Sequence, residues 1–288
     1  MDSTLSPDEL ARLKRLAAQL RLNIVRMMGP NKYHHFGGSL SAADLVTALY
    51  FYKMRYDAKN PRDPGRDRFL ISKGHSVPAQ YAALAMAGFF PLEELPTLKK
   101  FGSRLQGHPV MQLTPGLEGC TGSLGQGLSF SNGMALAAGI HKLDYRVYCL
   151  IGDGELHEGQ VWEAAMTSVR KRLTNLTAIV DANGLKGMDN ACLCCKPLDG
   201  IADRWAGFGW QVIDIDGHDM RQICDALDWA SSRDDCPAVI VARTVKGKGV
   251  SFMENQAAFH NGIVTDEQYL KAVAELEATL SKESEARK

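Results

Sequence analysis

The chain has 288 residues, 45% of them hydrophobic, which suits one large α/β domain or two smaller ones. Lys and Arg number 33 and so do Asp and Glu, so the formal net charge of zero gives no electrostatic basis for binding nucleic acid or an anionic membrane. No basic segment followed by an apolar core opens the chain, and no apolar run is long enough to cross a bilayer. We therefore expect a cytoplasmic protein with neither nucleic acid nor a membrane among its partners.

The seven cysteines are scattered, which fits a reducing compartment better than a disulfide framework. Cys192, Cys194 and Cys195 lie close together, but the second cysteine pair of a zinc site has no clear counterpart. We interpret the cluster as free thiols.

The first half of the chain predicts several helices and one strand. Leucines at helical spacing predict a helix over residues 8–28, and Ser41 is placed to cap another that runs to about residue 52. The glycine-containing residues 29–39 between them predict a loop. A short strand is predicted at residues 69–71, and helices at 78–88, 91–101 and 128–141. Residues 102–127 form a long glycine-rich loop, and loops of that length in a compact domain are usually functional.

The second half alternates apolar strands with helices. Strands are predicted at residues 147–151, 176–180, 210–215 and 238–242, and helices at 161–170, 198–206, 220–230 and 266–280, with irregular structure at 251–260. This alternation predicts an α/β fold with a doubly wound, mostly parallel sheet of about five or six strands and helices on both faces. We expect residues 1–265 to form one domain, with 266–288 as its C-terminal amphipathic helix and charged tail.

Polar residues gather where the predicted strands end. Ligands of doubly wound sheets bind beyond the carboxyl ends of the strands. The residues that this reading places there are His75, Asp153, Asn183, His218 and Lys246. So many polar groups at the carboxyl ends of the strands, which we call the rim of the sheet, favour a ligand-binding site there over a set of ordinary turns.

The segment Gly152-Asp153-Gly154 indicates a metal and a diphosphate. Carboxylate, amide and carbonyl oxygens suit Mg²⁺, which commonly bridges to phosphate oxygens. Asp153, the Asn183 side chain and a backbone carbonyl near Leu185 would supply part of such a shell. Gly154 would bring a backbone N–H toward the phosphate at the start of the next helix. A dinucleotide site is disfavoured, because no Gly-x-Gly-x-x-Gly joins a first strand to a helix, and no Walker sequence is present.

Four histidines occupy loops flanked by glycine, proline or asparagine: His35, His75, His108 and His260. Imidazole can hydrogen-bond to sugar hydroxyls and shuttle protons near neutral pH. His141 and His157 lie on or beside predicted helices, and we interpret both as surface or structural residues. Glu158 is either a solvated residue of the first helical turn or a buried carboxylate at an interface.

In combination, these motifs resemble the amino-terminal, diphosphate-binding half of transketolase, and most closely the small subunit of split, two-component transketolases. The resemblance runs from about residue 16 to residue 262. Its motifs are His35-Phe36-Gly37-Gly38-Ser39-Leu40, Ser72-Lys73-Gly74-His75, Gly107-His108-Pro109, Thr121-Gly122-Ser123-Leu124-Gly125-Gln126-Gly127, Gly152-Asp153-Gly154 with Asn183, and Lys246-Gly247-Lys248-Gly249 before His260.

The resemblance implies thiamine diphosphate with Mg²⁺ or Ca²⁺ as cofactors. The implied metal ligands are Asp153, Asn183 and the Leu185 carbonyl. The implied cofactor-binding residues are His75, Gly154, Asn183, Lys246 and His260 on the diphosphate side and Gly122, Ser123 and Leu124 on the aminopyrimidine side. The implied catalytic residues, which would orient sugar hydroxyls and assist proton transfer, are His35, His108 and His260. Glu158 matches an interface glutamate that couples two active sites.

The implied activity is that of a transferase, which moves a two-carbon ketol unit from a ketose phosphate to an aldose phosphate, with the cofactor as electron sink. Family members need a second domain that activates the pyrimidine ring and holds the substrate phosphate. Residues 265–288, which follow the last motif, are too few for it. We therefore expect activity only with a partner subunit that carries the pyrimidine-binding and C-terminal domains, in an α2β2 heterotetramer.

Three positions depart from the family pattern. His34 stands where the family usually has glycine, Ala182 lies inside the Asp-x-Asn triplet, and Lys186 stands where related chains often carry glutamine. None of these removes a predicted ligand, and we expect His34 and Lys186 to bear on substrate choice.

Two other functions are compatible with parts of the sequence. The α subunit of a 2-oxo acid dehydrogenase-type decarboxylase shares the Gly-Asp-Gly and Asn pattern, but the Ser-Lys-Gly-His and Gly-His-Pro segments argue against it. A non-catalytic module that binds the cofactor or a partner is disfavoured by the intact metal ligands and histidines.

Overall fold

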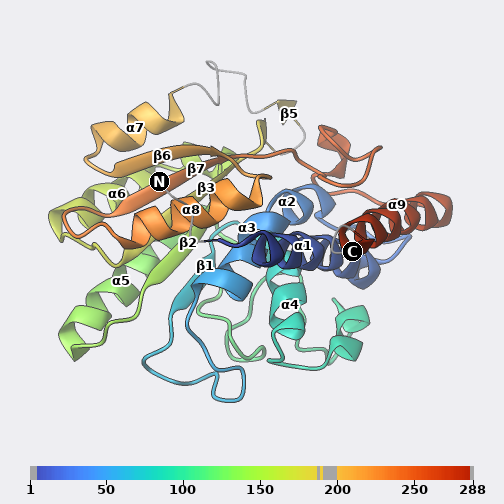
Figure 1. The fold of residues 1–288 in the computed structure, drawn as a ribbon, viewed down its shortest axis with the longest axis horizontal. Helices are drawn as coiled ribbons and strands as arrows, with labels where there is room; N and C mark the ends of the chain where they lie inside the picture. Colours follow the sequence, from blue (N-terminus) through green and yellow to red (C-terminus); the bar gives the residue numbers. More distant parts are fainter. Residues whose placement is uncertain (1–4, 187–188, 191–199, 286–288) are drawn as a thin grey trace.

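A five-stranded parallel sheet forms the centre of the protein (Figure 1). The computed structural model describes residues 5–186, 189–190 and 200–285. The strands lie in the order β1 (Arg68–Ile71), β2 (Val147–Gly152), β3 (Leu176–Ala182), β7 (Ala238–Arg243) and β6 (Gln211–Asp216). The five predicted strands are confirmed to within two residues, and β4 (Leu185–Lys186) and β5 (Asp189–Asn190) add a small antiparallel pair.

The chain crosses the sheet in two directions, which places helices on both faces. It passes from β1 to β2 to β3 through α5 (Gln126–His141) and α6 (Gly159–Arg170), and later returns from the edge strand β6 to β7 through α8 (Met220–Ser231). Because crossovers between parallel strands are right-handed, this reversal puts α8 on the opposite face from α5 and α6. The short helix α7 (Ile201–Gly207) shares the apolar core of α5 and α6. The predicted doubly wound fold is confirmed.

Residues of each central strand alternate between two apolar cores. In β2, Tyr148 and Leu150 belong to the larger core, whereas Val147, Cys149 and Ile151 belong to the smaller one. All six residues of this strand are buried. A strand covered on both faces needs apolar side chains at successive positions, which explains the apolar run before Gly152.

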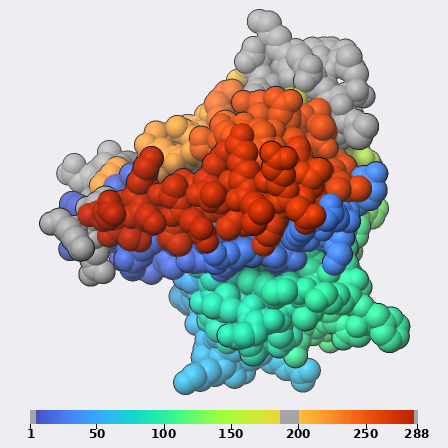
Figure 2. Space-filling view, turned by 90° about the vertical axis from the view of Figure 1, so that its right-hand side faces the viewer, coloured from blue at the N-terminus to red at the C-terminus, as the bar shows by residue number. Residues whose placement is uncertain are grey.

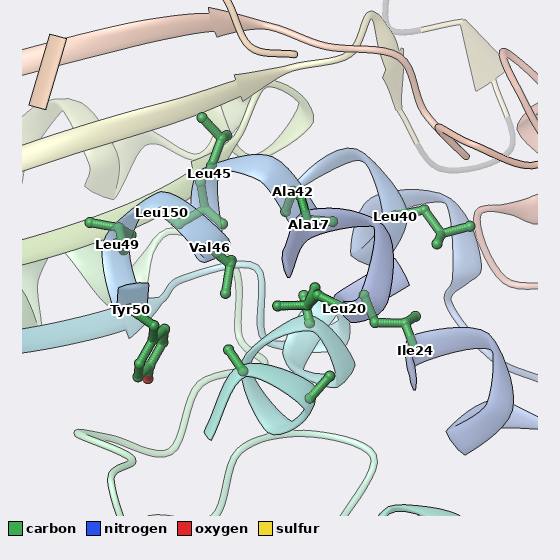
Figure 3. Packing of buried hydrophobic residues seen from close by; sticks show 14 of the residues in the cluster. Ala17, Leu20, Ile24, Leu40, Ala42, Leu45, Val46, Leu49, Tyr50 and Leu150 are labelled. Atoms are coloured by element: carbon green, nitrogen blue, oxygen red, sulfur yellow. The ribbon is translucent and has the colours of Figure 1, made fainter. Parts of the chain in front are cut away.

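The larger core is built on helices α1 (Pro7–Met28), α2 (Phe36–Ser41), α3 (Ala43–Ala48), α4 (Val77–Met86) and α9 (Asp266–Glu285). Figure 3 shows Leu20 and Ile24 of α1 among the residues of α2 and α3. Helix α9 packs beside α1 and forms a ridge across one face of the molecule in Figure 2.

The predicted helix over residues 8–28 is confirmed as α1, which begins one residue earlier. The Ser6 hydroxyl accepts a hydrogen bond of 3.2 Å from the Glu9 N–H, and proline occupies the first turn.

The predicted loop at residues 29–39 is wrong over its second half, because α2 begins at Phe36. Glycine disfavours a helix by about 1 kcal/mol, but here close packing requires it: a Cβ on Gly37 would lie 2.7 Å from Cγ of Lys246. Ser41 is not a cap either. It is the last residue of α2, and its hydroxyl donates to the Asp181 carboxylate at 2.6 Å.

The predicted helix at 91–101 is also wrong, because only a 3₁₀ helix forms at Leu92–Thr97. Pro96 lies inside it and lacks the N–H that an α-helix would use. The irregular segment 251–260 is confirmed apart from one short 3₁₀ turn at Ala257–Phe259.

The cysteines of the described ranges are free thiols, with Cys149 and Cys224 buried and Cys120 exposed. The Cys192–Cys195 cluster lies outside the described residues. Among the helices that the structure describes, none has the length and apolar character needed to cross a bilayer.

Replacing Leu20 by alanine should lower the free energy of unfolding by about 2–5 kcal/mol, because Leu20 is fully buried in the larger core and the change leaves a cavity. Urea unfolding measures this. Leu270 is 65% exposed on α9, so Leu270→Ala should change the same quantity by less than about 0.5 kcal/mol. Equal losses in the two variants would contradict the packing described above.

Candidate active site

A cavity of about 410 Å³ opens beyond the carboxyl ends of β1, β2 and β3. Most of the predicted site residues line it: His35, His75, His108, Gly122, Leu124, Asp153, Gly154, Glu158, Asn183, Leu185, Lys246 and His260. Ser123 is exposed and is not part of the lining. The fold thus brings together loops that are far apart in sequence.

Asp153, Asn183 and the Leu185 carbonyl lie at the floor of the cavity. The two carboxylate oxygens of Asp153 accept hydrogen bonds from Gly154 N (2.7 Å) and Gly184 N (2.5 Å), which fix the orientation of the side chain. Burial, together with the nearby charge of Asp181, raises the pKa of Asp153 to about 6. A divalent cation would offset this destabilisation of the ionised carboxylate.

The donor set fits a hard cation. The Asn183 side-chain oxygen accepts from Leu185 N at 3.2 Å, and the Leu185 carbonyl accepts from the Lys246 ammonium at 2.9 Å. That carbonyl therefore already contacts a cationic group. An all-oxygen set of this kind suits Mg²⁺ or Ca²⁺. In the described parts of the chain no group of three or more His, Cys, Asp or Glu side chains is arranged to hold a metal.

Asp181 and Lys73 form a buried ion pair behind this floor, which sequence reasoning missed as a feature of the site. The Lys73 ammonium also donates to the Gly38 carbonyl at 3.1 Å, and Asn183 Nδ2 donates to Asp181 at 3.4 Å. The bond to Asp181 occupies the amide nitrogen of Asn183, so the side-chain oxygen is the atom that would bind a cation. The signal in the sequence was an ionisable residue near the end of an apolar strand: Asp181 lies within β3, and Lys73 is two residues after β1.

Glu155 is a second buried carboxylate that sequence reasoning missed. It accepts from the Ser72 hydroxyl (2.5 Å), from Gly125 N (2.8 Å) and from Gly152 N (3.1 Å). Burial raises its pKa. One side chain therefore joins the loops that follow β1 and β2 to the start of α5.

Three imidazoles cluster on the wall of the cavity. The ring centroids of His35 and His75 are 4.9 Å apart, those of His75 and His260 are 5.1 Å apart, and those of His35 and His260 are 5.5 Å apart. His35 immediately precedes α2, His75 lies in the 3₁₀ turn Gly74–Ser76, and His260 follows the turn Ala257–Phe259.

These imidazoles are neutral at pH 7. Burial, with nearby lysine charges, lowers the pKa of His35 and of His260 to about 4 and that of His75 to about 2. Lys246 donates to Nδ1 of His260 at 2.9 Å. Nδ1 is therefore the acceptor, and the hydrogen of the neutral ring lies on Nε2, where it can be donated to a ligand.

Lys246 lies in the wall of the cavity and is buried, with 2% of its surface exposed. Burial, together with the Lys73 charge, lowers its pKa to about 8, so it still carries a charge at pH 7. Its stem lies over Gly37, which explains the need for glycine there.

The opposite side of the cavity is open. His108 is exposed and its ring lies against Gly122, where a Cβ would come within 3.0 Å of Cδ2 of the ring. Glu158 is also exposed, at the residue before α6, and packs against Gly125. In this single chain Glu158 is therefore a solvated residue and not a buried carboxylate.

His218 and His34 contact other parts of the fold and do not line the cavity. His218 accepts from Val245 N at Nε2 (2.8 Å), so its Nδ1 hydrogen is donated to Asp44 (2.7 Å). It lies at the predicted rim but not in the cavity lining. His34 is buried against Phe36 and its backbone pairs with Gly262. The Lys186 side chain lies outside the described part of the chain.

Replacing His34 by glutamine should change the pH dependence of stability. Burial lowers the pKa of His34 to about 4. In the unfolded chain histidine titrates near 6.5. The unfolded state therefore binds a proton that the folded state excludes, and stability falls as pH drops from about 6.5 toward 4. Between pH 6 and pH 5, the free energy of unfolding should fall less steeply in the variant than in the wild type. The difference in slope should be about 1 kcal/mol per pH unit. Urea unfolding at both pH values tests this, and an unchanged slope would contradict it.

Comparison with known proteins gives the family. A family model described as "Transketolase, thiamine diphosphate binding domain" matches residues 13–280. The chain is 44% identical over 264 residues to a 6-deoxy-6-sulfo-D-fructose transketolase subunit of Clostridium sp., covering 90% of this chain and 96% of that protein. It is 42% identical over 262 residues to an apulose-4-phosphate transketolase subunit of Phocaeicola vulgatus, covering 91% of this chain and 92% of that protein.

Longer relatives match over part of their length. Human transketolase is 41% identical over 263 residues, which cover 90% of this chain and 41% of the human protein. The crystal structure of transketolase from Campylobacter jejuni superposes with a TM-score of 0.85 at 28% identity, covering 94% of this chain and 45% of that one. By the family match and these identities, the chain belongs to the transketolase family and carries its thiamine diphosphate-binding domain.

Proposed function

We propose that this chain is the diphosphate-binding subunit of a two-component transketolase, which transfers a two-carbon ketol unit from a ketose phosphate to an aldose phosphate. The observation that carries the proposal is the cavity itself. It places the oxygen atoms of Asp153, Asn183 and Leu185, which suit a hard cation, beside a cluster of neutral imidazoles. Two relatives of similar length are named as subunits of transketolases, which supports the same assignment.

The floor of the cavity would hold the cofactor's charged end. Asp153, Asn183 and the Leu185 carbonyl would bind Mg²⁺ or Ca²⁺, and the Lys246 ammonium would leave Leu185 to contact the diphosphate. Gly154, His75 and His260 would add hydrogen bonds to the same anion. Thiamine diphosphate, when bound, would supply the electron sink for breaking and forming the carbon–carbon bond.

The imidazoles would contact the hydroxyl groups of the sugar. His35 and His260 are neutral at pH 7, so each ring can donate one hydrogen bond and accept another. Together with His108 at the open side, they would orient the hydroxyl groups and carry protons to and from them. The protein's part in the reaction is then placement and proton transfer.

A partner subunit would complete the open side. Gly122, Ser123 and Leu124 would meet the aminopyrimidine there, and the exposed Glu158 would pass into an interface between two active sites. We propose a partner that carries the pyrimidine-binding and C-terminal domains, in an α2β2 assembly in the cytoplasm. Residues 1–265 and the C-terminal segment would form one domain, since Ala272 and Leu276 of α9 are buried in the larger core.

Co-expression with a partner chain that carries the pyrimidine-binding and C-terminal domains should give two-carbon transfer that requires thiamine diphosphate and a divalent metal. A panel of ketose phosphate donors and aldose phosphate acceptors measures it. The isolated chain should be inactive, because one side of its cavity is open. Transfer by the isolated chain would contradict the need for a partner, and decarboxylation of a 2-oxo acid by the pair, without ketol transfer, would contradict the reaction.

In the same pair, Asp153→Ala should weaken metal-dependent binding of thiamine diphosphate by at least about 10-fold, because it removes the charged ligand of the metal. Calorimetric titration of the cofactor in the presence of Mg²⁺ measures this directly. His141→Ala is the matched control, since that histidine is exposed at the end of α5 and outside the cavity lining. Full transfer activity in the Asp153→Ala pair would instead favour a non-catalytic module.

A further inference from the structure

Glu155 is a buried carboxylate in the lining of the cavity, and the proposed function assigns it no part. It lies in the 3₁₀ turn Gly154–His157, two residues after Asp153, and 2% of its surface is exposed. Burying an ionised carboxylate is costly unless it is paired or hydrogen-bonded. The hydrogen bonds that Glu155 accepts therefore show which parts of the cavity it connects.

Three donors from separate segments of the chain converge on the two oxygens of Glu155. Oε1 accepts from the Ser72 hydroxyl at 2.5 Å and from Gly125 N at 2.8 Å, and Oε2 accepts from Gly152 N at 3.1 Å. Ser72 follows β1, Gly152 ends β2, and Gly125 immediately precedes α5. Because both oxygens act as acceptors, a carboxylate matches this set of donors and an amide side chain does not.

Ser72 extends the connection to the first turn of α5. Its hydroxyl accepts from Gly127 N at 3.1 Å while it donates to Glu155, and the close packing at this point leaves no room for a Cβ on Gly127. A hydroxyl carries one hydrogen, and here that hydrogen is used on Glu155. The oxygen of Glu155 that faces Ser72 must therefore remain an acceptor.

Gly125 ends the segment of residues 122–124, which we place on the aminopyrimidine side of the cavity. At the start of this segment, the Thr121 hydroxyl donates to the Ile71 carbonyl of β1 at 2.7 Å. At its end, Gly125 N donates to Glu155. The segment is thus held at both ends, and Glu155 is the side chain that holds the second end.

Gly152 belongs to the floor of the cavity. It directly precedes Asp153, whose carboxylate accepts from Gly154 N in the same turn that contains Glu155. Oε2 of Glu155 is therefore fixed relative to the proposed metal ligand, while Oε1 holds the segment on the other side. One side chain sets the separation between the two parts of the cavity.

We propose that Glu155 is a positioning residue for the cofactor, which keeps the residues that would bind the diphosphate at a fixed distance from those that would meet the aminopyrimidine ring. This rests on the proposed function. A ligand that contacts both parts of the cavity gains from their fixed separation, because the loop needs less ordering when the ligand binds. A ligand that contacts only the floor gains nothing from it.

The test compares two ligands in the reconstituted pair with Mg²⁺. Thiamine diphosphate would contact both parts of the cavity, and inorganic pyrophosphate would contact the floor alone. Glu155→Gln has nearly the same shape but only one acceptor oxygen, so at least one of the three hydrogen bonds is lost. Calorimetric titration should show thiamine diphosphate binding weakened about 10-fold and pyrophosphate binding changed by less than about 2-fold.

Glu275→Gln is the matched control. Glu275 of α9 also accepts from a serine hydroxyl and a backbone N–H, both of Ser251 and both at 2.7 Å, but it is outside the cavity lining. Its replacement should leave both affinities unchanged. Ser72→Ala, which removes one bond to Glu155 and keeps the other two, should weaken only thiamine diphosphate binding, by about 3-fold. This variant tests the same connection if Glu155→Gln does not fold.

Equal weakening of both ligands by Glu155→Gln, or of neither, would overturn this role. The melting temperature of each variant is measured alongside, because a carboxylate with a merely structural role would lower it without changing the ratio of the two affinities. If the wild-type pair binds neither ligand, the proposed function itself fails. If it binds both and the variants keep the wild-type ratio, only the role of Glu155 fails.

Discussion

The candidate site depends on one buried carboxylate, that of Asp181 at the end of β3. Burial alone would raise its pKa, but Lys73 and hydrogen bonds from Ser41 and Thr244 bring the pKa below its usual value. An unpartnered charge in this position would cost several kcal/mol, which these partners together offset. They come from the segment after β1, from α2 and from the segment after β7. A single anion therefore fixes the relative positions of the elements around the cavity floor.

Glycines let polar side chains approach the same point. Gly37 accommodates the stem of Lys246, and Gly38 lies against Ser76 and near the Lys73 ammonium. The result is a cavity with two lysine ammonium groups on its inner wall and imidazoles that burial keeps neutral. Such a cavity places ammonium groups, which suit a phosphorylated ligand, beside rings that remain free to exchange protons.

One side of the site is buried and the other is exposed, which matters for how the site would be completed. The floor around Asp153 and the wall around Lys246 are buried by the chain's own packing. The side formed by His108, Ser123 and Glu158 is exposed. In the proposed assembly the chain supplies a rigid half of the site, and the half that closes it comes from a partner. Exclusion of water strengthens charge interactions, so such a site would reach its full electrostatic effect only when assembled.

The sequence by itself determined the strands and the position of the residues that we propose as metal ligands. Apolar runs that end in polar turns predicted all five strands of the main sheet, because burial on both faces leaves a local signature. The position of Asp153 and Asn183 at one edge followed from the rule that parallel strands point their carboxyl ends the same way. The histidine motifs were also local, and the cavity brings four of them together.

Only the tertiary structure decided the rest. The helix α2 forms despite its glycines because Lys246, far along the chain, packs on Gly37. The role of Ser41 depends on Asp181, 140 residues away, and that of Lys73 on the same carboxylate at a separation of 108. Composition and periodicity report the local environment of a residue, but the partner of a buried charge is set by which strands become neighbours. The sequence therefore located the proposed ligands, and the fold supplied the contacts that hold those side chains.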